Sequence, residues 1–553
     1  MGATAAVAPD VDRTLSRRER AALLALGVGT AVILPGALNR FVFPKLAVVL
    51  LGALFAWWCP GRGRLPRAVV VLLAASGLLL ATAALAGSAP LAQLLGRPPR
   101  YEGLIALPVY AAALAAGARL FGGRQSRESC GWFLDCLAAA AIVIAAEAVL
   151  ETAGVGALSS SVARPGSLLG NASDEGAWAV LALGPLASAA LDARSPLLSA
   201  GTLAAMVTLV CSGSRGALLG AGALAIVLLA LLDRRCRLVV LAGVIAIAAA
   251  AVALPATRAR VFEQSRHSAE SVSGHELLST ETVRLIGSHP LLGVGPSGFI
   301  DAIPAEHDRR WQREIGPANP PDSPEDWLLQ AASSGGIPLL LLAMALVAIT
   351  LRRGLATASR QRAGPERAAL IGMLGGLVGH AVALLFHFTS PGTTPLAALF
   401  AGALLAEPAG AWRAPSSGRR AAGVGVALAG TALLVVLVAG AIAELPLRSA
   451  YLDLGAGRYS QADTEFRLAE HLRPWDAGVA ADAAHSYAML AVAGVPGAAR
   501  LGLPWAAKEL AAWPDSVQGL TDAAALDRQA GRASAAHRLL RRAHRLDPSD
   551  PAL

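Results

Sequence analysis

The chain has 553 residues, of which 55% are hydrophobic and only 15% charged, with a mean hydropathy of +0.54. Soluble domains usually carry about 25% charged residues, so the composition argues against a large water-soluble protein. The net charge is +9, but most of the Lys and Arg residues lie in short connectors between apolar runs rather than on a soluble face, which argues against nucleic-acid binding.

Apolar runs long enough to cross a bilayer recur along the chain and predict an all-α, polytopic transmembrane bundle of about 12–13 helices. The five cysteines form no CxxC pair, which indicates neither a zinc site nor a disulfide framework. We expect a cytoplasmic segment at 1–20 and a membrane domain at 21–443. The predicted helices span 21–38, 45–59, 68–87, 103–121, 131–152, 174–192, 196–212, 216–232, 238–255, 335–352, 368–387, 393–407 and 421–443.

The connectors give the predicted helices a direction. Alternate connectors carry the Arg clusters, and the positive-inside rule places these connectors and the N-terminus in the cytoplasm. The chain is therefore expected in the plasma membrane, with a long loop at about 256–334 and everything after 443 outside it. Arginines on the outer side are not explained by topology and invite a functional interpretation.

Residues 444–553 form a polar, Ala-rich tail with an internal repeat. Gly457-Arg458-Tyr459 and Gly531-Arg532-Ala533 lie 74 residues apart and are followed by matching small and apolar positions, ending at Pro474 and Pro548. This resembles tetratricopeptide repeats, in which small residues lie where two helices cross. Three units fit, and such repeats mostly bind proteins. A helical bundle without repeats is the alternative.

Four segments on the outer side carry unusual polar residues. They are Arg97–Gly103, Arg164–Asn171, the turn Ser212–Gly216, and the long loop with Arg284, His289–Pro296, Asp322–Gln330 and Gly335–Pro338. Guanidiniums that face a wet cavity suggest an anionic ligand, because their planar fork of donors matches phosphate oxygens.

The order of these segments is similar to that of the O-antigen ligase and polymerase superfamily over residues 20–405. Ser-Arg-Gly lies between two helices, Arg284 precedes His-Pro-Leu-Leu-Gly-Val-Gly-Pro, and a polar turn runs into Trp-Leu-Leu-Gln and Gly-Gly-Ile-Pro. The resemblance implies a membrane glycosyltransferase that transfers a glycan from undecaprenyl pyrophosphate to an acceptor hydroxyl outside the plasma membrane. The acceptor would be a lipid, a glycan or a protein.

The resemblance also assigns roles to residues. Arg215 and Arg284 would hold the donor pyrophosphate. We further expect substrate contacts from Arg100, Arg164, Asn171 and Asp326. The family usually has a His-Asn pair where this chain has Glu325-Asp326, so Glu325 is the candidate general base. No cofactor or metal is expected.

Other interpretations of the acidic turn and of the whole chain stay open. Asp322, Glu325 and Asp326 would suit Mg²⁺ or Ca²⁺, or His307 or His387 would serve as the base instead. The chain would otherwise have lost ligase activity, or the turn would be only a solvated acidic turn that caps a helix. A transporter or flippase for an anionic lipid-linked substrate is a second class of function. An inactive scaffold that recruits envelope enzymes through the tail is a third.

Overall fold

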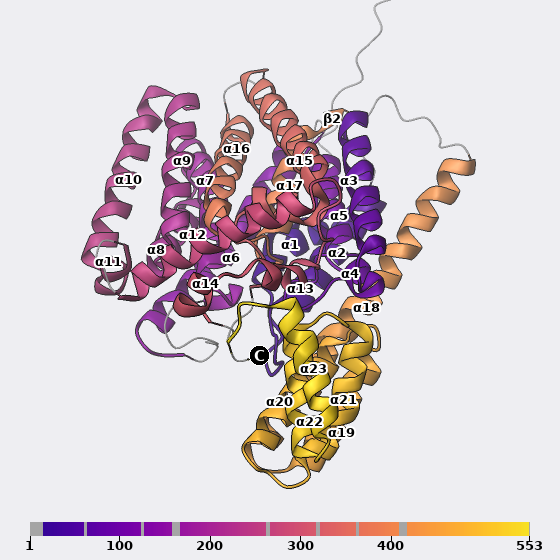
Figure 1. The fold of residues 1–553 in the computed structure, drawn as a ribbon. Coiled ribbons are helices and arrows are strands. Elements are labelled where there is room, and N and C mark those ends of the chain that lie inside the picture. The colour runs from indigo at the N-terminus through magenta and orange to yellow at the C-terminus, as the bar shows by residue number, and fades with distance from the viewer. Residues whose placement is uncertain are drawn as a thin grey trace, which may run out of the picture.

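A computed structural model describes residues 15–59, 63–122, 126–156, 166–261, 266–316, 321–360, 364–408, 417–551 and 553. Almost all of the secondary structure in these ranges is helical (Figure 1). Two strands of two residues each, β1 (Gly63–Arg64) and β2 (Glu407–Pro408), pair antiparallel at one end of the bundle. The predicted all-α architecture is confirmed.

Twelve of the thirteen predicted membrane segments coincide with a helix. The first, predicted at 21–38, is α-helical only as far as Val28 and continues as a short 3₁₀ helix and a loop. The helices are α1 (Arg17–Val28), α2 (Val42–Trp58), α3 (Arg67–Ala86), α5 (Leu107–Phe121), α6 (Ser126–Thr152), α7 (Ala172–Ala193), α8 (Pro196–Ser212), α9 (Arg215–Leu231), α10 (Arg234–Ala253), α15 (Trp327–Arg360), α16 (Pro365–Ala383), α17 (Thr394–Leu405) and α18 (Ser417–Gly455). Within the described ranges, seven of them are long and apolar enough to cross a membrane, and five shorter ones are also apolar. The chain is a multi-pass membrane protein.

Glycines bring the central helices of the bundle into backbone contact. A Cβ on Gly184 of α7 would lie 2.2 Å from the carbonyl oxygen of Gly372 on α16, and one on Gly220 of α9 would lie 2.4 Å from that of Gly379. Helices in a membrane gain little from the hydrophobic effect when they associate. Small residues at such crossings let the backbones approach closely, and the resulting van der Waals contacts stabilise the association. The apolar core of the bundle forms around these contacts, while α3 and α10 expose most of their surface.

The segment between α10 and α15, predicted as a long loop, is largely helical. It contains α11 (Pro255–Val261), α12 (Arg266–Ser288), α13 (Phe299–Ala302) and α14 (Arg309–Glu314). Leu277, Leu278 and Leu285 of α12 pack with Phe299, Ile303 and Trp311 into a small core of their own. The long loop is therefore a folded layer that lies over one end of the bundle (Figure 1).

Beyond α18, the tail consists of α19 (Tyr459–Leu472), α20 (Gly478–Val492), α21 (Ala498–Ala512), α22 (Val517–Gln529) and α23 (Ala533–Leu546), and it has a separate hydrophobic core. Its turns alternate between two kinds. Gly457, Gly494 and Gly531 recur every 37 residues, each at φ between +74° and +80°. After each one, the next backbone N–H donates to a carbonyl five residues back, which closes the preceding helix in the same way.

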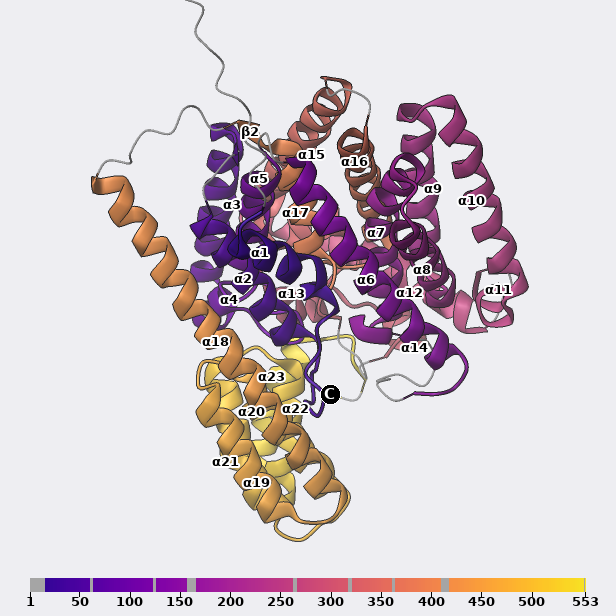
Figure 2. The ribbon, with the colours of Figure 1, turned by 180° about the vertical axis from the view of Figure 1, so that it is seen from behind.

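The proline-containing turns of the tail face the bundle. Arg473 lies over the ring of Phe43 on α2, Tyr101 donates from its hydroxyl to Asp476 at 2.7 Å, and the guanidinium of Arg97 lies 3.9 Å from the ring of Trp513. Gln312 on α14 donates to Asp547 at 3.2 Å. The tail thus contacts the bundle end-on, at the same end as the long loop, while α18 joins the two without a break (Figure 2).

Candidate functional site

The Ser212–Gly216 turn lies between α8 and α9, where Gly213 adopts a φ of +56°. Ser214 caps α9 by accepting a hydrogen bond from the backbone N–H of Ala217 at 3.3 Å, so Arg215 becomes the first residue of the helix. Gly176 at the start of α7 fits closely against this turn, because a Cβ there would lie 2.7 Å from the Ser212 hydroxyl. The half-buried Arg215 is therefore held at a helix N-terminus, where backbone N–H groups and the helix dipole favour an anion.

Two glycine-containing motifs of the long loop pack directly against each other. The backbone N–H of Val294 donates to the Ser333 carbonyl at 2.7 Å, and that of Ile337 donates to the Pro290 carbonyl at 2.8 Å. Gly336 has a φ of +70° and interrupts α15, and a Cβ on it would lie 2.5 Å from the Leu291 backbone. The His-Pro-Leu-Leu-Gly-Val-Gly-Pro and Gly-Gly-Ile-Pro motifs therefore have a structural reason for their glycines.

The acidic turn before α15 has two different carboxylates. Asp326 is the N-cap of that helix and accepts from the backbone N–H groups of Leu328 and Leu329 at 2.7 and 3.1 Å. Glu325 has a φ of +53° and directs its carboxylate to Nδ1 of His275 at 3.1 Å. The two side chains are 39% and 36% exposed. Asp326 thus caps a helix, whereas Glu325 is half-exposed and adjacent to a histidine.

The sequence does not indicate His275 as a site residue, whereas His307 and His387 are its candidates for a substitute base. Those two are engaged elsewhere: Nδ1 of His307 lies 2.8 Å from the buried Glu281, and Nε2 of His387 lies 3.0 Å from Asp174. His275 lies in no motif, and 50 residues separate it from Glu325, so no local pattern indicates the pair.

Arg284 lies on α12, nine residues after His275. At about 100° per residue the two side chains point to opposite sides of that helix, about 13 Å apart along its axis. Arg284 is 44% exposed, and its guanidinium lies 3.6 Å from Glu281 and 3.5 Å from Asp308. Backbone hydrogen bonds from Trp311 and Arg310, and the nearby Arg284, lower the pKa of Asp308, so it stays ionised beside the arginine.

The Arg97–Glu102 segment joins the long loop, the tail and the start of α15. The Arg97 guanidinium forms a buried ion pair with Asp301, and Nε of Arg100 donates to Asp322 at 3.0 Å. Glu102 accepts hydrogen bonds from Gln330 and Thr389, and burial raises the pKa of its carboxyl group. Both arginines are therefore neutralised by carboxylates, and Arg100 binds the turn that carries Glu325.

The other predicted contacts have separate positions. Asn171 is the N-cap of α7 and accepts from the backbone N–H of Ser173 at 2.7 Å, while Arg164 lies outside the described residues. In the first turn of α7, the carboxylate of Asp174 accepts a hydrogen bond from the Ser390 hydroxyl at 2.6 Å. Across the described ranges, no group of three or more His, Cys, Asp or Glu side chains has an arrangement that would hold a metal ion.

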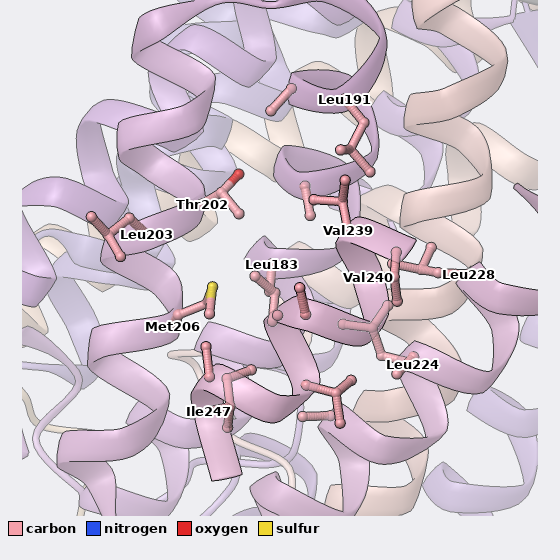
Figure 3. Close-up of a pocket in the computed structure, with 18 of the residues that line it drawn as sticks. Leu183, Leu191, Thr202, Leu203, Met206, Leu224, Leu228, Val239, Val240 and Ile247 are labelled. Carbon is pink, nitrogen blue, oxygen red and sulfur yellow. The ribbon is translucent and has the colours of Figure 1, made fainter. Parts of the chain in front are cut away.

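An apolar cavity of about 490 Å³ lies between α7, α8, α9 and α10 (Figure 3). All four helices line this cavity with apolar side chains, among them Leu183 and Leu191 of α7, Met206 of α8, Leu224 and Leu228 of α9, and Val240 of α10. Thr202 contributes one of its few polar atoms. Its walls suit a hydrocarbon chain better than a sugar.

Residues 200–344 match the family model described as O-antigen ligase. The matched segment runs from α8 into α15 and includes Arg215, Arg284 and Glu325. A comparison with curated proteins gives no match. Over these residues the multi-pass membrane protein is similar to the O-antigen ligase family, and this similarity suggests a membrane glycosyltransferase-type function.

Proposed function

We propose that the protein transfers a glycan from undecaprenyl pyrophosphate to an acceptor hydroxyl on the outer side of the plasma membrane. The observation that carries this proposal is the O-antigen ligase match, which covers the Ser214-Arg215-Gly216 turn and the folded loop over the same end of the bundle. The N-terminus would be cytoplasmic, with the tail and loop outside.

Arg215 would bind the donor pyrophosphate at the start of α9. Its position at a helix N-terminus supports this role, because the backbone N–H groups there add to the positive charge of the guanidinium. The same helix contributes Leu224 and Leu228 to the apolar cavity, about 14–20 Å further along its axis. The pyrophosphate would thus lie at Arg215 and part of the polyprenyl chain along α9.

Arg284 would be the second pyrophosphate contact. Its guanidinium is more exposed than those of Arg97 and Arg100, and its two carboxylate neighbours lie at 3.5 Å or more. Because Arg284 and His275 are on opposite sides of α12, donor binding would require this helix to turn or shift if both act on one substrate.

Glu325 would act as the general base, with His275 holding its carboxylate. As the acceptor oxygen attacks the anomeric carbon, its proton would pass to Glu325. The bond from that carbon to the pyrophosphate oxygen would break, and undecaprenyl pyrophosphate would leave with its charge stabilised by the arginines.

The tail would form a tetratricopeptide-like unit of three helical hairpins that binds a partner or an acceptor next to the site. The 37-residue recurrence of its glycine turns supports this assignment. The tail's contacts with Arg97 and Tyr101 support a position beside the end of the bundle that the long loop covers.

The test is transfer from a radiolabelled lipid-linked glycan by the full-length protein in nanodiscs. Arg215→Ala and Arg284→Ala should each lower the transfer rate by about 10²–10³-fold, the usual loss when one preorganised donor is removed. Arg234→Ala and Arg313→Ala are the matched controls. Arg234 begins α10 at the end of the bundle opposite to Arg215, and Arg313 is an exposed arginine of α14. Normal transfer by both site variants would refute the proposed pyrophosphate contacts.

A further inference from the structure

The last helix of the tail, α23, has an arginine stripe formed by Arg538, Arg541, Arg542 and Arg545. With about 100° per residue, these four fall within an arc of about 100°. Ala536 and Ala543 are buried on the opposite side of the helix. No acidic residue interrupts Ala533–Leu546. The stripe therefore concentrates positive charge on the outward face of the helix.

Most of this charge lacks a partner in the part of the chain that the structure describes. Arg542 lies 3.2 Å from Asp515, but within the described residues no hydrogen bond or ion pair joins the exposed Arg538, Arg541 or Arg545 to another side chain. Elsewhere in the tail, Arg458, Arg467 and Arg473 each have a carboxylate partner at 3.1 Å or closer. Three unpaired guanidiniums on one face repel one another, and an anionic partner would relieve this repulsion.

The direction of α23 favours a polymer over a lipid surface as that partner. The helix begins after the glycine turn at Gly531 and runs toward the bundle, where Asp547 accepts from Gln312 of the long loop. Arg538 therefore lies about 10 Å further from the bundle than Arg545 does. Attraction to anionic headgroups falls off within about 10 Å, so a membrane surface would engage only one end of the stripe.

We propose that the arginine stripe binds an acidic polysaccharide, so that the glycan handled by this protein carries carboxylate or phosphate groups. This inference rests on the proposed transferase function and specifies its substrate class. The Gln312–Asp547 contact joins the end of α23 to the loop that carries Arg284. A glycan chain that extends outward from the site would thus pass along the stripe, where bidentate Arg–carboxylate or Arg–phosphate contacts would retain it between transfers.

The experiment measures binding without donor, by full-length protein in nanodiscs of neutral lipid. The probes are polygalacturonate as the acidic polymer, dextran as the neutral polymer, and vesicles rich in phosphatidylglycerol. We expect salt-dependent binding of polygalacturonate and none of dextran. Arg538→Ala/Arg541→Ala/Arg545→Ala should weaken binding by about tenfold or more, as expected for the loss of three charge contacts.

Two further variants separate charge, geometry and folding. Arg458→Ala/Arg500→Ala/Arg528→Ala removes the same net charge from other exposed positions of the tail and should change binding less than about threefold. Arg538→Lys/Arg541→Lys/Arg545→Lys keeps the charge of the stripe, and its affinity for polygalacturonate should lie between those of the wild type and the triple Ala variant.

Wild-type affinity in the triple Ala variant, or stripe-dependent binding of the anionic vesicles but not of polygalacturonate, would overturn the proposal. Because the assay contains no donor, its result is independent of whether Arg215 and Arg284 support transfer. A protein that transfers normally but binds no acidic polymer would refute the stripe alone.

Discussion

Two sets of charged residues at the tail-facing end of the bundle differ in how deeply they are buried. Arg97 and its partner Asp301 are 6% and 9% exposed and form an ion pair that Trp513 of the tail covers. Arg284, Glu325 and His275 are 36–44% exposed. In the sequence both sets look alike, as arginines and acids on one side of the membrane. Burial separates them: the first set joins parts of the molecule, and the second is accessible to solvent.

The largest effect expected from this comparison is on transfer. Glu325→Gln should lower the transfer rate by about 10²–10⁴-fold, the usual contribution of a general base, and leave the melting temperature unchanged because the side chain is half-exposed. His275→Ala should have a smaller effect and alter the pH profile of transfer. Glu276→Gln, an exposed neighbour on α12, is the control. Full activity of Glu325→Gln would assign the base to another group.

Arg97→Ala should instead affect folding first. It leaves the carboxylate of Asp301 buried without its partner, and burial already raises the pKa of that group. Breaking such a pair costs about 3–5 kcal/mol, measured as a lower free energy of unfolding or melting temperature. Arg97→Met/Asp301→Leu should recover much of this stability. If Arg97→Ala melts like wild type, the ion pair does not hold the tail and loop together.

The tail should also respond to pH through Glu509, which is buried at 2% exposure near Ser516. Burial raises its pKa from 4.5 to about 7. The folded tail therefore binds this proton more tightly than the unfolded chain, so the stabilisation is complete below pH 4.5 and is lost as the pH rises through about 7.

The loss amounts to roughly 3 kcal/mol at most. Glu509→Gln should remove this part of the pH dependence and melt at a higher temperature than wild type at pH 8. Melting curves of both proteins between pH 5 and 8 would measure the difference. Parallel pH dependence in the two would show that Glu509 ionises without cost.

Asp326 should show the smallest effect. Loss of its two capping hydrogen bonds in Asp326→Ala should lower the free energy of unfolding by about 1 kcal/mol. Asp326→Ser, which keeps a capping oxygen, should restore stability. If Asp326→Ser is stable but transfers poorly, the carboxylate also contacts a substrate, as expected from the sequence.

Much of the architecture could be predicted because it depends on residues close together in the chain. Apolar runs such as Ala68–Gly87 indicate a membrane helix by length alone, and Gly457 and Gly531 mark turns by their position after a helical pattern. The Ser212–Gly216 turn and the glycines near Gly336 were also recognised as special positions from sequence.

The candidate site was predicted less completely. Sequence alone grouped Arg100 with Arg215 and Arg284 as anion ligands, yet Arg100 is bound by Asp322, 222 residues away. It treated Glu325 and Asp326 as one acidic turn, whereas one caps α15 and the other faces His275. It predicted no helix at α12. The apolar side chains Leu277 and Leu285 of this helix are buried only because they pack against Phe299 and Trp311 of the same segment.

The sequence by itself thus determined most of the membrane helices and several of the turns, because hydrophobic length and backbone conformation are local properties. Only the tertiary structure decided which charges are neutralised and which histidine faces Glu325. It also decided that the proline-containing turns of the tail lie against the end of the bundle that the long loop covers. Those outcomes depend on distances between residues 50–416 positions apart, and a charge acquires its role only when packing fixes its partner and its access to water.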